Sequence, residues 1–161
     1  MRLSSRVALA AALCFMTVPA HAAGTQSTTT TAAPEDANWA AAKSAIAQKK
    51  YDEAAPLLQQ VVAKDAGNAD AWNYLGYISA RADRNDDALG YYGKALALDP
   101  RHRGANEYLG ELYLKIGDLP KAEERLKVLD GACLFGCAEF DLLKKAVNAY
   151  KQTGKYVPQK G

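Results

Sequence analysis

The sequence predicts an all-α protein, a right-handed stack of three helix-turn-helix hairpins closed by a C-terminal capping helix. One observation is that a pattern of aromatic, Leu-Gly and Ala residues returns after 34 residues, so that Leu75-Gly76 is followed by Leu109-Gly110. A fixed return of that length is typical of stacked helical hairpins. The other is that apolar residues recur with helical spacing from Glu35 onward, interrupted by short turn sequences.

Residues 1–22 have the composition of a secretory signal peptide. Arg2 and Arg6 give a positively charged start, residues 7–18 form an apolar stretch, and Ala20-His21-Ala22 ends in a small-x-small motif suited to cleavage. The apolar stretch is short for a membrane span, although a retained signal anchor is the alternative. We therefore expect an exported, periplasmic protein without stable membrane insertion after cleavage.

Removal of the signal changes what the composition implies. The remaining 139 residues contain 18 basic and 18 acidic side chains, so the mature chain is formally neutral and lacks the positive charge that nucleic-acid binding needs. Residues 23–34 are rich in threonine and have little to bury, which predicts a flexible linker. Two cysteines remain, Cys133 and Cys137, and an even count in an exported chain favours a disulfide.

The three hairpins are expected over residues 35–68, 69–102 and 103–131. Asp36 can cap the first helix by accepting from free amides, and the second helix is expected to open at Asp52. Small residues allow paired helices to approach closely, while neighbouring leucines fill the remaining space. The small residues expected at these contacts are Ala54, Gly76, Ala88, Gly110 and Ala122.

The second hairpin resembles the tetratricopeptide repeat family. The matching residues are Trp72, Leu75-Gly76, Ala88, Tyr92, Ala95 and Pro100. The third hairpin keeps Leu109-Gly110 but has leucines where the family has an aromatic residue and a second alanine, and the first hairpin keeps chiefly alanines. The resemblance covers about 100 residues. It implies a non-catalytic binding module in which the first helix of each hairpin lines a concave groove.

The side chains expected to face this groove combine aromatic rings with charges of both signs. They are Trp39, Lys43, Asn73, Tyr74, Tyr77, Arg81, Glu107, Tyr108, Glu111 and Lys115. Such a mixture suits an extended peptide or a partner helix, although several tyrosines could instead belong to the core. Glu107 and Glu111 share a helix face and are expected to be a solvated or groove-lining pair. Tyr74 and Tyr108 replace the clamp residues with which some family members grip chaperone C-termini, so that ligand is disfavoured.

The C-terminal region, residues 132–153, is expected to form a cysteine-containing loop and the capping helix, followed by a flexible tail over residues 154–161. The last hairpin of a repeat stack has an apolar face that must be covered, and an amphipathic helix with a polar outer face can cover it. In the loop, a disulfide between Cys133 and Cys137 competes with a redox dithiol and with a copper site that also uses His102. The Cys-x-x-x-Cys spacing differs from the usual two-residue spacing of redox motifs.

The sequence predicts a binding function rather than an enzymatic one. It lacks a phosphate-binding glycine loop, a metalloprotease helix motif and a nucleophile elbow, and one mature histidine leaves little scope for general-base chemistry. We expect no cofactor and no metal, and a protein or peptide as partner. The alternative is a thiol-redox or metal-handling accessory protein that uses Cys133 and Cys137. Self-assembly through an exposed end of the stack is a third possibility.

Overall fold

The structure is a computed structural model that describes residues 36–158, so the predicted signal peptide and linker lie outside the described residues. The described residues form α-helices and no β-strand, which confirms the predicted all-α class. The helices are α1 (Ala37–Ala47), α2 (Tyr51–Lys64), α3 (Ala69–Arg81), α4 (Asn85–Leu98), α5 (Arg103–Lys115), α6 (Leu119–Ala132) and α7 (Ala138–Thr153).

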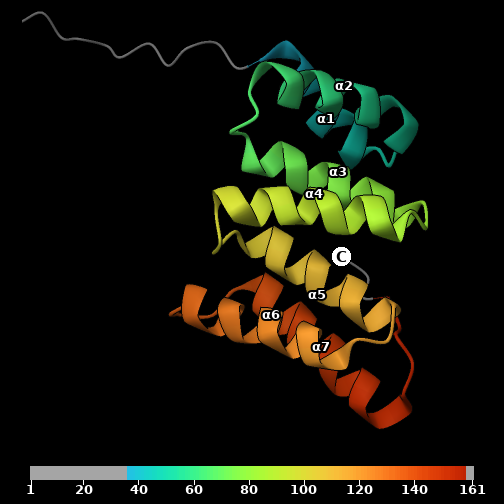
Figure 1. The fold of residues 1–161 in the computed structure, drawn as a ribbon, viewed down its shortest axis with the longest axis vertical. Coiled ribbons are helices and arrows are strands. Elements are labelled where there is room, and N and C mark those ends of the chain that lie inside the picture. Colours follow the sequence, from blue (N-terminus) through green and yellow to red (C-terminus); the bar gives the residue numbers. More distant parts are fainter. Residues whose placement is uncertain (1–35, 159–161) are drawn as a thin grey trace, which may run out of the picture. The chain divides into compact units, whose positions relative to one another are not determined.

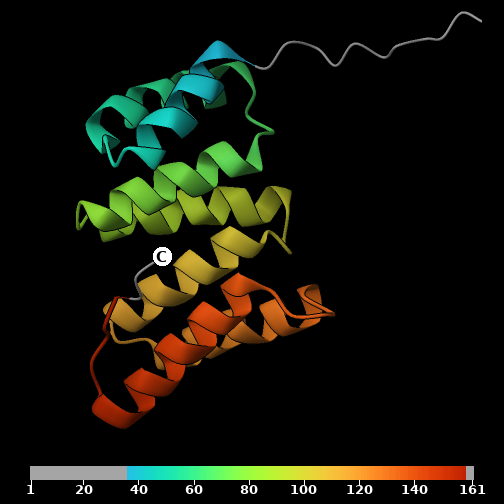
Figure 2. The ribbon, with the colours of Figure 1, turned by 180° about the vertical axis from the view of Figure 1, so that it is seen from behind.

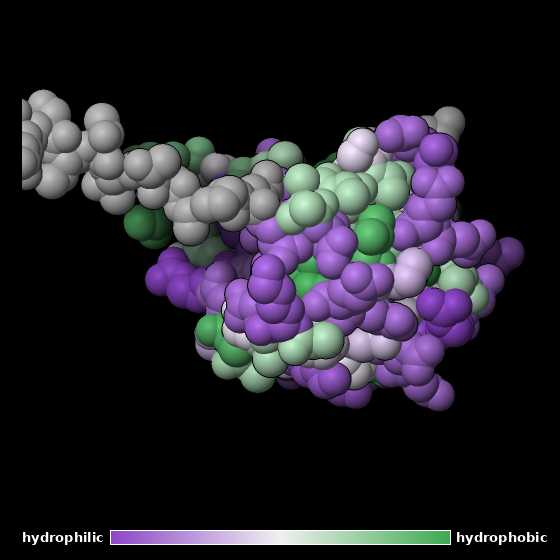
Figure 3. All heavy atoms as spheres, turned by 90° about the horizontal axis from the view of Figure 1, so that it is seen from above, coloured by the Kyte–Doolittle hydropathy of each residue, from purple (hydrophilic) through white to green (hydrophobic). Residues whose placement is uncertain are grey.

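Helices α1 to α6 pair as three consecutive hairpins, α1 with α2, α3 with α4, and α5 with α6. The pairs follow one another in chain order along the stack, and α7 packs against both α5 and α6 (Figures 1 and 2). The predicted arrangement of three hairpins and a capping helix is therefore present. Seen from the α1–α2 end, polar side chains and apolar patches share the surface (Figure 3).

Side-chain caps begin four of the helices. Asp36 accepts from the backbone N–H groups of Asn38 and Trp39 at the start of α1, at 2.9 and 3.2 Å, as predicted. Asn68, His102 and Asp118 accept from backbone N–H groups at the starts of α3, α5 and α6. Each such bond satisfies an amide that has no partner within its helix. In contrast, α2 begins one residue before the predicted Asp52 and has no side-chain cap.

The 34-residue interval recurs in the backbone of the turns inside the hairpins. Lys49, Asp83 and Gly117 each have a positive φ, of 60°, 57° and 86°, and each is separated from the next by that interval. The left-handed conformation suits glycine and is strained for the other two residues. The first hairpin, whose sequence is divergent, therefore uses the same turn geometry as the second.

The core contains small residues where helices meet. Alanines at equivalent positions of the three hairpins, Ala54, Ala88 and Ala122, have no exposed surface. Gly76 of α3 faces the ring of Tyr92 in α4, as expected for a close contact within one hairpin. Gly110 differs from the prediction, because the atoms nearest to it belong to Leu143 of α7. In the third hairpin this glycine makes room for the capping helix. Among the described residues, no helix is long and apolar enough to cross a membrane.

Candidate partner-binding face

Aromatic rings from four helices lie next to one another on one face of the stack. Trp39 of α1 is 5.8 Å from Tyr74 of α3, and Tyr77 of α3 is 4.9 Å from Tyr108 of α5, measured between ring centroids. Tyr51 of α2 lies 5.8 Å from Tyr77. All five rings are partly buried, so each also presents surface to solvent. We call these five residues the aromatic face.

Arg81 at the C-terminal end of α3 adds a positive charge to this face. Its guanidinium carbon lies 5.9 Å from the ring centroid of Tyr51 and 5.7 Å from that of Tyr77, which are cation-π distances. The hydroxyl groups of the two tyrosines share a hydrogen bond of 3.3 Å. Burial and this bond raise the pKa of Tyr77 to about 12. The phenol of Tyr77 therefore keeps its proton at neutral pH and can exchange hydrogen bonds with a partner.

Tyr51 and Arg81 also line an open hollow of about 580 Å³ between the start of α2 and the end of α3. The hollow is bordered mainly by charged and polar side chains, including Lys49, Lys50 and Arg84. The face therefore continues from rings into a polar recess. The sequence does not indicate Tyr51, because the family resemblance places groove residues on the first helix of each hairpin and Tyr51 begins a second helix.

Two predicted groove residues are buried instead. Asn73 is only 4% exposed and lies against Gly104, where a Cβ atom would be 3.2 Å from its Nδ2. Glu107 is only 5% exposed, which excludes the predicted solvated position. Burial, together with the charges of Glu111 and Glu139, raises the pKa of Glu107 to about 8. At neutral pH this carboxyl group therefore mostly retains its proton.

The two predicted lysines make intramolecular contacts. The ammonium nitrogen of Lys43 lies 5.2 Å from the ring centroid of Trp39, at the edge of the aromatic face. Lys115 donates to the carbonyl oxygen of Ala80 at 2.9 Å and to Asp83 at 2.6 Å. Lys115 thus joins the end of α5 to the turn between α3 and α4. Its ammonium group is engaged there rather than presented to a partner.

Glu111 is contacted by a residue that the sequence did not indicate. The phenol of Tyr156, which follows α7, donates a hydrogen bond of 2.8 Å to its Oε2 atom. The expectation of a flexible tail from residue 154 did not include this contact. An aromatic residue after a helix-ending glycine is a weak signal, and nothing in the repeat pattern relates position 156 to position 111.

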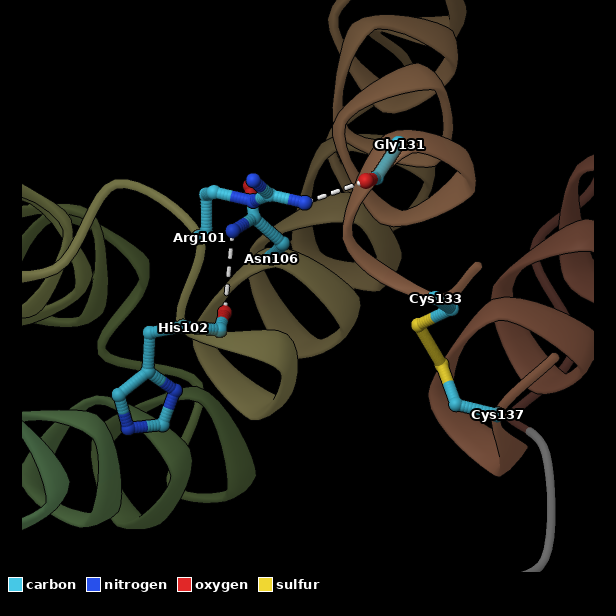
Figure 4. Close-up of a disulfide and its surroundings, with 6 residues drawn as sticks. All are labelled: Arg101, His102, Asn106, Gly131, Cys133 and Cys137. Atoms are coloured by element: carbon cyan, nitrogen blue, oxygen red, sulfur yellow. Dashed lines mark hydrogen bonds between the residues drawn. A yellow bond between two sulfur atoms is a disulfide. The ribbon is translucent and has the colours of Figure 1, made fainter. Parts of the chain in front are cut away.

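The cysteine loop joins α6 to α7. Cys133 directly follows α6 and Cys137 directly precedes α7. Their sulfur atoms are bonded, with the Cα atoms 5.6 Å apart (Figure 4). That separation suits a disulfide. Gly136 between them has a φ of 86° and donates its N–H to the carbonyl oxygen of Cys133. The guanidinium of Arg101 donates to the carbonyl oxygen of Gly131 at the end of α6.

His102 is held apart from this loop. Its Nδ1 accepts from the N–H of Ala105 at 3.1 Å, and its Nε2 is 2.9 Å from Asp70, while the ring points away from both cysteines (Figure 4). A copper site built from His102 and the cysteines would have to break these contacts. Within residues 36–158, no group of three or more His, Cys, Asp or Glu side chains is placed to hold a metal ion.

The fold is similar to several solved structures. One of them is PcrH, solved in complex with the chaperone binding region of PopD. The match covers 73% of this chain and 91% of PcrH, with a TM-score of 0.64 and 18% sequence identity. The Yersinia enterocolitica type III secretion translocator chaperone SycD gives a TM-score of 0.64 at 18% identity, over 73% of this chain and 83% of SycD. A complex of SycD with a peptide of the translocator YopD gives a TM-score of 0.61 at 20% identity, over 71% of this chain and 87% of that SycD chain.

Sequence comparison finds relatives among much longer proteins. The chain is 32% identical over 126 residues to superkiller complex protein 3 of Mus musculus, and 28% identical over 127 residues to tetratricopeptide repeat protein 37 of Xenopus laevis. These matches cover 72% and 73% of this chain but only 8% of each relative. Two family models described as "Tetratricopeptide repeat" match residues 40–92 and 79–132. The chain therefore belongs to the tetratricopeptide repeat family.

Proposed function

We propose that this protein is a non-catalytic scaffold that binds a protein or peptide partner on the aromatic face. The observation that carries the proposal is a set of partly buried rings from all three hairpins, which pair as Trp39 with Tyr74 and as Tyr77 with Tyr108 and are flanked by Arg81. Tyrosine and tryptophan supply contact area at a low cost in side-chain entropy. A nearby charge can fix the register of a bound segment.

Two further observations support this assignment. PcrH and SycD share the fold. PcrH was solved with the chaperone binding region of PopD, and SycD was solved with a peptide of the translocator YopD. The residues that could instead support chemistry are engaged: the sulfurs of Cys133 and Cys137 are bonded at the ends of two helices, and both ring nitrogens of His102 have partners. The sequence of residues 1–22 supports export to the periplasm as the place of action.

The test is a comparison of bound partners from a cell-envelope extract. Wild-type protein is compared with Tyr74→Ala/Tyr108→Ala, which removes two rings, and with Arg81→Glu, which reverses an exposed charge on the same face. We expect both variants to lose a shared set of partners. Tyr91→Ala is the matched control, because Tyr91 stacks on Trp72, which is not one of the five residues of the aromatic face.

Circular dichroism and thermal unfolding establish that each variant is folded before partners are compared. The Arg81→Glu variant is decisive if the double tyrosine variant is unstable, since Arg81 is an exposed residue. Identical partner sets for wild type, Arg81→Glu and the control would defeat the proposal. If binding of the partners depends instead on reduction of the Cys133–Cys137 bond, the redox alternative is favoured.

A further inference from the structure

The chain reverses direction after α7. Gly154 ends the helix with a φ of 67° and donates its N–H to the carbonyl oxygen of Tyr150 at 2.7 Å. Glycine favours this left-handed conformation, which commonly terminates helices. The hydroxyl of Thr153 then accepts from the N–H of Lys155 at 3.2 Å and fixes the turn. The following segment runs back beside α5 in both views (Figures 1 and 2).

Tyr156 brings this segment onto the binding side of α5. Its ring packs with the apolar residues around α7, and its phenol donates to Glu111, which lies 45 residues earlier in the chain. Partial burial and the charge of Glu111 raise the pKa of Tyr156 above its ordinary range, while Arg81 acts in the opposite direction. The phenol therefore lies within the electrostatic reach of the residues that flank the aromatic face.

Residues 156–158 have no regular secondary structure. One ring lies against a helix and one hydroxyl donates to a carboxylate, a charge-assisted bond that is stronger than a neutral one. An extended peptide from a partner would use the same two contacts. The tail thus has the chemistry expected of a ligand of this face.

We propose that the partner is an extended peptide with a tyrosine whose phenol replaces that of Tyr156 on Glu111, and that the tail is an internal stand-in for it. This inference rests on the proposed function of the aromatic face. The partner must displace residues 155–158 before its tyrosine reaches the carboxylate. The tail therefore competes with the partner from within the same molecule.

The surroundings of Glu111 favour tyrosine over other side chains. The apolar residues around α7 offer a surface for an aromatic ring, as they do for Tyr156, and a phenol donates a hydrogen bond without introducing a charge. An acidic side chain or a phosphotyrosine would meet the carboxylate of Glu111. Like charges in a partly buried site repel one another, so both should bind poorly.

The probe is a synthetic peptide with the sequence of residues 151–158, labelled with a fluorophore at its N-terminus. We measure its affinity for full-length wild type and for full-length Tyr156→Ala by fluorescence anisotropy, and follow weak binding by NMR into the millimolar range. The internal tail acts at a high effective concentration, so wild type should bind the peptide at least about tenfold more weakly than the variant.

Two changes test the hydrogen bond itself in the Tyr156→Ala protein. A peptide with phenylalanine in place of its tyrosine should bind about tenfold more weakly, because it cannot donate to Glu111. The added substitution Glu111→Gln should weaken binding of the tyrosine peptide to a similar degree. Lys155→Ala is the matched control, since it alters the tail and leaves Tyr156 in place, and it should bind the peptide as wild type does.

The outcomes separate this inference from the proposed function. The inference is overturned if the peptide binds neither protein, if it binds both equally, or if the tyrosine and phenylalanine peptides bind equally well. Tyr156→Phe, which keeps the ring, replaces the alanine variant if that variant is unfolded, and it should release the tail in part. Partners that still depend on Arg81 would leave the proposed function intact in each of these cases.

Discussion

Gly76 of α3 and Tyr92 of α4 are in such close contact that a Cβ atom at position 76 would lie 2.6 Å from two atoms of the tyrosine ring. Tyr92 is only 1% exposed and is among the largest fully buried side chains. Its ring cannot move aside without disturbing the residues packed around it. This pair sets the distance between the two helices of the hairpin that matches the family best.

Substitution of Gly76 is therefore expected to destabilise the protein. Gly76→Ala should lower the free energy of unfolding by about 1 to 3 kcal/mol through overpacking, and Gly76→Leu should lower it further. Gly93→Ala is the control, because nothing lies within 4 Å of a Cβ atom there, and it should raise stability by about 0.5 to 1 kcal/mol. Chemical denaturation checks both values, and a wild-type midpoint for Gly76→Leu would contradict the contact.

The buried carboxyl group of Glu107 predicts how stability depends on pH. Its pKa is raised to about 8 from an ordinary value of 4.5, so between these values the folded protein holds a proton that the unfolded chain has released. The stability that this carboxyl group contributes is fully present below the unfolded-state pKa, and it is lost as the pH rises through the folded-state pKa. Each unit of difference corresponds to about 1.4 kcal/mol.

Glu107→Gln removes this titration. We expect the variant to be more stable than wild type by at least about 1 kcal/mol at pH 9, and the advantage to disappear near pH 4. Urea denaturation at a series of pH values measures the difference. Glu124→Gln on the exposed side of α6 serves as the control and should leave the pH dependence unchanged. A parallel pH dependence for wild type and Glu107→Gln would show that the carboxyl group titrates normally.

The disulfide is expected to act as a structural staple. Its loop is short, so replacing both cysteines by serine should cost about 2 kcal/mol, at the low end of the usual range. Wild type treated with reductant should show the same loss in thermal unfolding. Thiol titration of the oxidised protein should find no reactive thiol at Cys133 or Cys137. Two titratable thiols without reductant would instead support the redox alternative.

The strained turn at Lys49 offers a stabilising substitution. Its φ of 60° is costly for a residue with a side chain, whereas the equivalent residue of the third hairpin is Gly117. Lys49→Gly should raise the free energy of unfolding by about 1 kcal/mol. Lys50→Gly, one residue later, lies outside the left-handed region and should destabilise or have no effect. Equal effects at the two positions would exclude relief of backbone strain as the cause.

The sequence by itself determined the fold class, the three hairpins and the capping helix. Helical periodicity, helix caps such as Asp36 and the 34-residue return are local or regularly repeated signals, and each is visible without knowledge of the neighbours in space. Much of the aromatic face was also predictable, because Tyr74, Tyr77 and Tyr108 follow from their positions on the first helix of a hairpin.

Only the tertiary structure decided which of these side chains are accessible and what they contact. Burial of Asn73 and Glu107 depends on helices from other hairpins and from the cap, and Gly110 meets Leu143 of α7 rather than its paired helix. Tyr156 contacts Glu111, which lies 45 residues earlier in the chain, and the 34-residue repeat does not relate these two positions. A contact of this kind arises from the path of the chain in space, and a periodic pattern records only spacing along the chain.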